Sequence, residues 1–150
     1  MKRTGCTGPS DTPPLYLIDG FNFLHAVVLQ GRERARWWSE ENQRRVVSRV
    51  EELGAAIDGF EAWVVFDRRG SAHEASSRDG TPVRSELGLE VHAAADADDY
   101  IVARCAELQG QREVRVVSAD RSLVDRARHR GARGISPWAF AGGNARAPAQ

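Results

Sequence analysis

Short runs of consecutive apolar residues constrain the fold of this chain more than any other feature. Two runs, Leu15–Ile18 and Ala62–Phe66, are uninterrupted, and a third strand is predicted at Val114–Val117, where Arg115 is the one polar residue. Uninterrupted apolar runs of this length are typical of strands that are buried on both faces of a sheet. Weaker strands are predicted at Leu89–His92 and Gly134–Ser136. A sheet of such strands needs helices on both of its faces.

Segments with helical periodicity separate the predicted strands. The clearest helix is predicted over 40–58, where apolar residues recur on one face and Ser39 can cap the first turn. Shorter helices are predicted over 22–29, 96–109 and 121–130. A polar loop is expected over 68–88. This alternation of strands and helices predicts an α/β domain with a parallel sheet, in which ligands bind beyond the carboxyl ends of the strands.

The length of the chain indicates a single domain. At 150 residues, it favours one compact unit with a core of its own. The segments 1–14 and 141–150 are rich in glycine, proline and small residues. We therefore expect a flexible leader, a folded domain over 15–140 and a flexible tail.

Charge and cysteine content narrow the classes of partner. The 21 basic residues balance the 21 acidic residues, so a nucleic-acid partner has to be held by a local basic patch. Cys6 and Cys105 match no metal-binding spacing, and no apolar stretch has the length of a signal peptide or a membrane span. We expect a cytoplasmic protein that does not contact a membrane. Its oligomeric state cannot be read from the sequence.

Aspartates stand where the predicted strands end. Strand ends carry Asp19, Asp67 and Asp120, and the start of the helix after the weaker strand carries Asp96, Asp98 and Asp99. Taken singly, each can be a turn residue or a helix cap. Taken together, they are expected to meet at one edge of a parallel sheet.

Such crowding has an energetic consequence. Two carboxylates about 4 Å apart repel by roughly 4 kcal/mol at an effective dielectric constant of 20, so several of them need a cation or extra protons. A set of oxygen ligands without cysteine or histidine selects Mg²⁺ or Mn²⁺. A metal-activated water that hydrolyses a phosphodiester fits this site. A phospho-accepting receiver domain fits poorly, because it needs a lysine after a late strand and Lys2 is the only lysine.

Four motifs resemble, in the same order, those of the YacP-like family in the NYN branch of PIN-like nucleases. They are Leu-Ile-Asp-Gly-Phe-Asn at 17–22, Val-Val-Phe-Asp at 64–67, Ala-Asp-Asp-Tyr-Ile at 97–101 and Val-Ser-Ala-Asp at 117–120. The resemblance implies a PIN-like three-layer α/β/α domain with a mostly parallel central sheet. It also implies a metal-dependent ribonuclease, of the endonuclease type, that uses Mg²⁺ or Mn²⁺.

The same resemblance assigns roles to residues. It places Asp19, Asp67, Asp98 and Asp120 around the metal, Asp99 close by, and Asn22 where it positions water or phosphate. Related 5′ nucleases of bacterial DNA polymerases carry a further aspartate where Ser122 stands here. We therefore expect one tightly held metal and a second that is weak or recruited by substrate.

Substrate contacts are predicted next to the acidic positions. Arg68 and Arg69 follow Asp67, and Arg121 follows Asp120, so these arginines can pair with phosphates that flank the scissile one. RNA, single-stranded or structured, is the expected partner, with the ribosome as a further one. The alternative is a non-catalytic RNA- or ribosome-binding module of the same fold.

Overall fold

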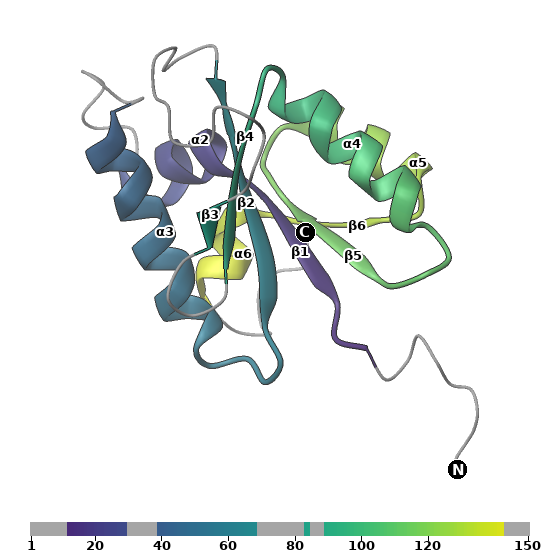
Figure 1. Cartoon of the computed structure of the whole chain (residues 1–150), viewed down its shortest axis with the longest axis horizontal. Helices are drawn as coiled ribbons and strands as arrows, with labels where there is room; N and C mark the ends of the chain where they lie inside the picture. The colour runs from purple at the N-terminus through teal and green to yellow at the C-terminus, as the bar shows by residue number, and fades with distance from the viewer. Residues whose placement is uncertain (1–11, 30–38, 69–82, 85–88, 143–150) are drawn as a thin grey trace.

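The structure is a computed structural model that describes residues 12–29, 39–68, 83–84 and 89–142. Its described strands form one six-stranded sheet in the order β3-β4-β2-β1-β5-β6 (Figure 1). The strands are β1 (Leu15–Asp19), β2 (Glu61–Asp67), β3 (Val83–Arg84), β4 (Glu90–Ala94), β5 (Val114–Val117) and β6 (Arg133–Ile135). The helices are α2 (Gly20–Phe23), the π-helix η2 (Leu24–Val28), α3 (Glu40–Gly54), α4 (Ala97–Leu108), α5 (Arg121–His129) and α6 (Pro137–Gly142).

The sheet is parallel except at one edge. β4, β2, β1, β5 and β6 pair in parallel, and the short β3 pairs antiparallel with β4. The two uninterrupted apolar runs occupy β1 and β2, and the segment 114–117 forms β5 next to β1. Burial on both faces explains why β1 and β2 lack polar alternation, whereas β5 contains the half-buried Arg115. The predicted α/β class with a mostly parallel sheet is confirmed.

Helices cover both faces of the sheet and give two core regions. Tyr16 and Ile18 of β1 belong to the core region that also holds residues of α2, η2, α3 and α6. Leu15 and Leu17 point to the opposite face and pack with residues of α4 and α5. Figure 1 shows α3 and α6 on one side of the sheet, and α4 and α5 on the other. The domain therefore has three layers.

Some element boundaries differ from the prediction. The helix predicted over 40–58 ends at Gly54, because Gly54 packs against the Phe60 ring and the chain turns back there toward β2. Ile57 consequently lies outside the helix and is 37% exposed. β3 lies within the segment expected to be a loop, and α6 was not predicted. α6 reaches Gly142, two residues into the predicted tail, while most of both end segments lies outside the described residues.

The chain reverses its direction of winding between β1 and β5. These two strands are neighbours, with Ile18 opposite Val117, yet β1 leads to α3 on one face and β5 leads to α5 on the other. Connections that diverge in this way leave a crevice at the carboxyl ends of the strands, where open α/β sheets bind ligands. Among the helices of the described segments, none has the length and apolar character to span a membrane.

Candidate active site

Strand alternation directs three polar side chains to the same face of the sheet. Asp19 follows Leu17 by two residues and Asp67 follows Val65 by two, and both apolar residues face α4 and α5. Ser118 extends β5 by one residue and lies opposite Asp19 in the parallel register. Since residues two apart in a strand share a face, the three side chains lie at the crevice on the side of α4 and α5.

The N-termini of α4 and α5 bring further carboxylates to this edge. Asp96 caps α4 by accepting a hydrogen bond from the backbone N–H of Asp99 at 3.0 Å. Asp120 caps α5 by accepting from the N–H groups of Ser122 at 3.0 Å and Leu123 at 3.3 Å. The capping interpretation is therefore correct for Asp96 and Asp120. It does not account for Asp98, which lies in the first turn of α4.

Capping does not account for the Asp19 carboxylate either. Asp19 occupies the N-cap position of α2 without a side-chain capping hydrogen bond of good geometry, although the backbone amide of Asn22 lies near enough to lower its pKa. The Asp19 carboxylate instead accepts a hydrogen bond from the hydroxyl of Ser118 at 3.2 Å. The same Ser118 oxygen accepts from the backbone N–H of Asp120 at 3.0 Å. Ser118 is only 3% exposed, so a buried hydroxyl joins the two acidic strand ends.

Asn22 holds the loop that precedes Asp120 in place from the other side of the crevice. Its side-chain oxygen accepts a hydrogen bond from the backbone N–H of Ala119 at 2.8 Å, which connects α2 to the loop between β5 and α5. This contact gives Asn22 a positioning role on the loop that carries Asp120. Ser118 was not singled out from the sequence. Its only signal was its place inside the Val-Ser-Ala-Asp motif, directly after a buried strand.

The surroundings of Asp19 disfavour its charge. Burial raises the pKa of Asp19 from its ordinary value of 3.8 to about 7, with further upward contributions from Asp98 and Asp120. The hydroxyl of Ser118 and the nearby backbone amide of Asn22 oppose this rise. Protonation of Asp19 near neutral pH is therefore far more favourable than that of an ordinary aspartate.

Asp98 experiences the same crowding. Burial raises its pKa, and the charges of Asp120, Asp96 and Asp67 raise it further, while Arg126 opposes the rise. The four carboxylates predicted to line the site therefore influence one another across the crevice, with Asp98 as the common neighbour. Among the described charged residues that shift the pKa of Asp98, three are acidic and one is basic.

The remaining predicted residues are distributed around this group. Asp99 lies beside Asp98 in α4, but its carboxylate pairs with Arg126 of α5 at 2.8 Å, and both side chains are largely exposed. Arg68 directly follows β2, and Arg121 is the first residue of α5. Arg69 lies outside the described residues. The metal-binding role of Asp99 and the phosphate-binding roles of the arginines stay predictions.

The chemistry of the site suits a hard cation, although no closed metal cage is formed. In the described part of the chain, no three acidic, histidine or cysteine side chains are arranged to hold one ion together. Mg²⁺ is commonly bound by one or two carboxylates and keeps several waters, so it does not require such a cage. The crevice supplies only oxygen donors from its acidic residues. Burial first, and neighbouring carboxylates second, raise the pKa values of Asp19 and Asp98, and a cation would relieve both effects.

Fold and site together define a three-layer α/β domain with an acidic crevice at the point where its winding reverses. The chain belongs to the YacP-like NYN domain family, whose sequence model matches residues 16–148. The predicted family is thus confirmed. A search of curated proteins finds no match.

Solved structures of the same fold are similar to this chain. One is the crystal structure of the W164L mutant of Rae1 (YacP) from Bacillus subtilis, with a TM-score of 0.63 and 19% identity over 85% of this chain and 72% of that chain. A second crystal structure of Rae1 (YacP) from Bacillus subtilis gives the same TM-score and identity over 84% of this chain and 70% of that chain. At this level of identity, the similarity supports the fold.

Proposed function

We propose that this protein is a ribonuclease that hydrolyses RNA phosphodiester bonds with a water activated by Mg²⁺ or Mn²⁺. The observation that carries the proposal is the cluster of mutually repelling carboxylates in the crevice, where the pKa of Asp19 rises to about 7. Groups with strongly perturbed pKa values gather at functional sites, because stability alone does not favour such an arrangement. Membership of the YacP-like NYN family supports the same reading.

The residues divide into cation ligands and groups that position them. Asp19, Asp98 and Asp120 would hold the cation through carboxylate oxygens and bound water, with Asp67 near Asp98. When bound, such a cation lowers the pKa of its water and neutralises charge on the scissile phosphate. Ser118 orients the Asp19 carboxylate by donating a hydrogen bond to it.

Arginines next to the crevice would orient the substrate. Arg68 follows Asp67 and Arg121 follows Asp120, so each can pair with a phosphate beside the scissile bond. Arg69 is expected to add to this set. Preference for RNA, an endonuclease mode and a cytoplasmic location come from the resemblance and the composition. A role on the ribosome belongs to the same group of expectations.

A non-catalytic RNA- or ribosome-binding module is the second candidate. It is favoured by the lack of three converging ligands among the described residues and by the pairing of Asp99 with Arg126. A module of this kind would use the basic side chains and would have no need of a bound cation.

Cleavage of a labelled single-stranded RNA separates the two candidates. The wild type is incubated with Mn²⁺ or with chelator, beside Asp98→Asn and the control Asp58→Asn, whose exposed carboxylate lies in the turn after α3. We expect cleavage that requires Mn²⁺, is abolished in Asp98→Asn and is unchanged in Asp58→Asn. Calorimetric titration with Mn²⁺ should show weaker binding to Asp98→Asn. RNA binding without cleavage by the wild type, unchanged in Asp98→Asn, would instead support the module.

A further inference from the structure

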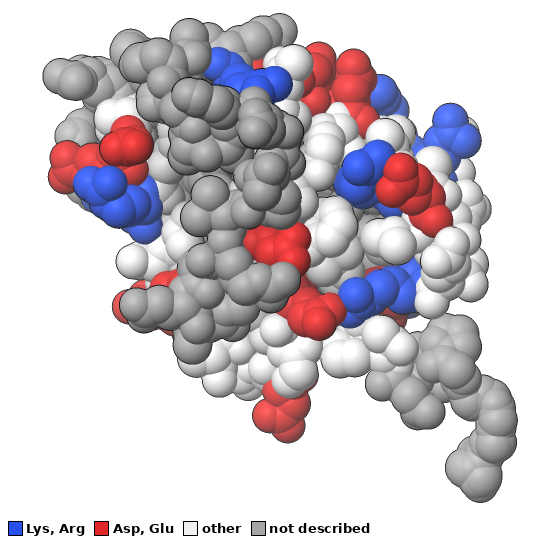
Figure 2. All heavy atoms as spheres, viewed as in Figure 1, with Lys and Arg blue, Asp and Glu red and all other residues white. Residues whose placement is uncertain are grey.

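Basic charge is concentrated in one part of a chain that is neutral as a whole. Residues 121–135 contain five arginines and one aspartate, a net charge of +4, whereas the full chain has a formal net charge of zero. Outside this segment and the acidic crevice, acidic and basic side chains of the described residues lie next to one another on the face that Figure 2 shows. The segment 121–135 forms α5 and β6, so this charge lies at one edge of the sheet.

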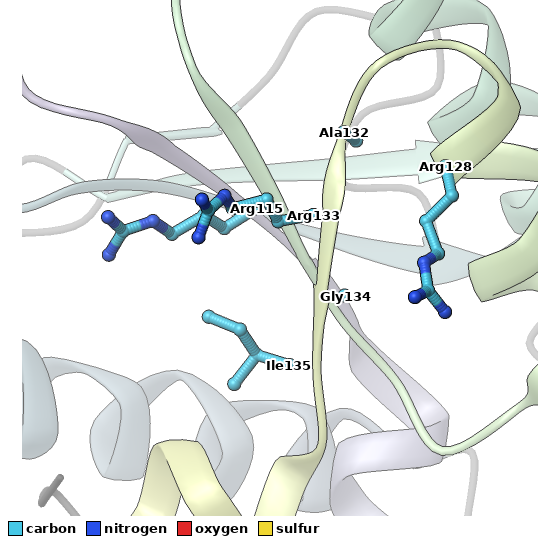
Figure 3. Close-up of a pocket in the computed structure, with 6 residues that line it drawn as sticks. All are labelled: Arg115, Arg128, Ala132, Arg133, Gly134 and Ile135. Atoms are coloured by element: carbon cyan, nitrogen blue, oxygen red, sulfur yellow. The ribbon is translucent and has the colours of Figure 1, made fainter. Parts of the chain in front are cut away.

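An open pocket lies at this edge, and we call it the β6 edge pocket. It is lined by Arg115, Arg128, Ala132, Arg133, Gly134 and Ile135 (Figure 3). Arg115 and Arg133 lie on one side of β6, and Arg128 of α5 lies on the other side. Three arginines therefore surround an edge strand from both faces of the sheet.

The charges of this pocket are poorly compensated. Arg115 and Arg133 are directly opposite each other in the pairing of β5 with β6, an arrangement of like charges that destabilises a sheet. Both arginines pair with the same carboxylate. The Oε2 atom of Glu113 lies 2.8 Å from Nε of Arg115 and 3.7 Å from Nε of Arg133. Arg128 forms no ion pair with any other described residue. The fold accounts for Arg115, which also donates a hydrogen bond to the Tyr16 hydroxyl at 2.9 Å, but it gives Arg128 no ion pair and Arg133 only a distant one. An anionic ligand would stabilise these two arginines.

The β6 edge pocket lies close enough to the acidic crevice for one chain of RNA to contact both. Arg115 precedes Ser118 by three residues of extended chain, about 10 Å at 3.3 Å per residue. Its side chain contacts Tyr16 on the opposite face, so an RNA strand would reach it by passing around the β6 edge. Arg121 and Arg128 are seven residues apart, which places them on one face of α5 about 10 Å from each other. Arg121 begins α5 at the crevice, so the arginines continue from the crevice to the pocket, interrupted by Asp125.

We propose that the β6 edge pocket binds backbone phosphates of RNA a few nucleotides from the bond that is cleaved. This proposal rests on the ribonuclease function proposed above for the crevice. Guanidinium groups pair with phosphate oxygens through two parallel hydrogen bonds, and they keep their charge at all physiological pH values. A polymer with a phosphate at every unit can occupy the crevice and the pocket together, which an isolated anion cannot do.

Binding of a labelled oligouridine, followed by fluorescence anisotropy in chelator over a series of salt concentrations, tests the proposal without cleavage. Each phosphate contact on a single strand contributes about 0.7 to the slope of log affinity against log salt. We expect the slope to fall by about 0.7 in Arg133→Gln and by about 1.4 in Arg128→Gln/Arg133→Gln. Asp125→Asn should bind more tightly than the wild type, a gain that loss of folding cannot produce.

Arg44 on α3 supplies a matched control. The side chains of Arg44 and Arg133 are both 72% exposed. Each also has one distant carboxylate partner, with 3.8 Å between Arg44 Nη1 and Glu40 Oε1 and 3.7 Å between Arg133 Nε and Glu113 Oε2. Arg44→Gln should therefore leave both affinity and slope unchanged. An equal loss in Arg44→Gln and Arg133→Gln would overturn the proposal, because it would indicate attraction by charge alone.

The other outcomes separate this proposal from that of the crevice. If the wild type cleaves RNA while the double variant binds as the wild type does, the pocket proposal is wrong and the ribonuclease stands. If binding depends on the arginines but no cleavage occurs, the pocket proposal holds and the ribonuclease fails. An oligoglutamate peptide that displaces the labelled RNA more effectively than unlabelled RNA does would also overturn the proposal, in favour of an acidic protein partner.

Discussion

Replacing Asp19 with asparagine removes the most strongly perturbed carboxylate of the crevice. Burial, followed by the charge of Asp98, raises the pKa of Asp19 from 3.8 to about 7 in the folded protein. Because the folded-state pKa lies above the unfolded value, the protonated form stabilises the native state. This contribution is complete below the unfolded value and is lost as the pH rises through the folded one. A shift of this size corresponds to on the order of 4 kcal/mol.

Urea unfolding of the wild type and Asp19→Asn in chelator, from acidic to mildly alkaline pH, measures this loss. The asparagine cannot ionise, so the unfolding free energy of the variant relative to that of the wild type should increase with pH. We expect an increase on the order of 4 kcal/mol between the two ends of this range. Titrating groups that do not interact with Asp19, such as His92, whose pKa is lowered by burial, occur in both proteins and cancel in the difference.

Addition of Mn²⁺ should reverse the order of stability at neutral pH. An ion that binds the folded but not the unfolded protein raises the unfolding free energy with the logarithm of the ion concentration divided by Kd. Asp19→Asn lacks one carboxylate ligand, so Mn²⁺ should raise its unfolding free energy less. A free-energy difference that does not change with pH would refute the reasoning, because Asp19 would then be neither buried nor crowded as described. Strong destabilisation of the variant at every pH would show that the carboxylate serves the fold.

Three further predictions concern single residues around the crevice. Ser118→Ala removes a buried hydroxyl, so it should cost about 1–3 kcal/mol in urea unfolding and raise the pKa of Asp19 further in an NMR titration. An unchanged pKa would contradict the hydrogen bond. Gly20→Ala should lower the stability in thermal melts by about 1–3 kcal/mol, because a Cβ there would lie 2.5 Å from the Phe66 ring. Asp99→Asn breaks an exposed ion pair with α5 and should cost less than about 1 kcal/mol. It should also retain more RNA cleavage than Asp98→Asn; equal loss would make Asp99 a cation ligand.

The sequence by itself determined the five parallel strands, the starts of α3, α4 and α5, and the edge of the sheet where the acidic residues meet. The apolar runs at 15–18 and 62–66 and the segment 114–117 became neighbouring strands inside the sheet, because helices cover both faces there and Arg115 is the one charged residue among them. The hydroxyl of Ser39 and the carboxylate of Asp96 cap their helices as predicted, since capping joins residues only three apart. These features depend on residues that are close together in the chain, so a single sequence is enough to predict them.

Tertiary structure alone decided how the crevice is held together and where the chain departs from its local pattern. The contacts from Ser118 to Asp19 and from Asn22 to Ala119 join residues almost a hundred positions apart. The cross-strand pairing of Arg115 with Arg133 likewise depends on the order of strands in the sheet. The pKa of Asp19 also belongs to this level, because burial and neighbouring charges exist only after folding. No local pattern encodes such distances, since they arise when separate segments pack against the same face.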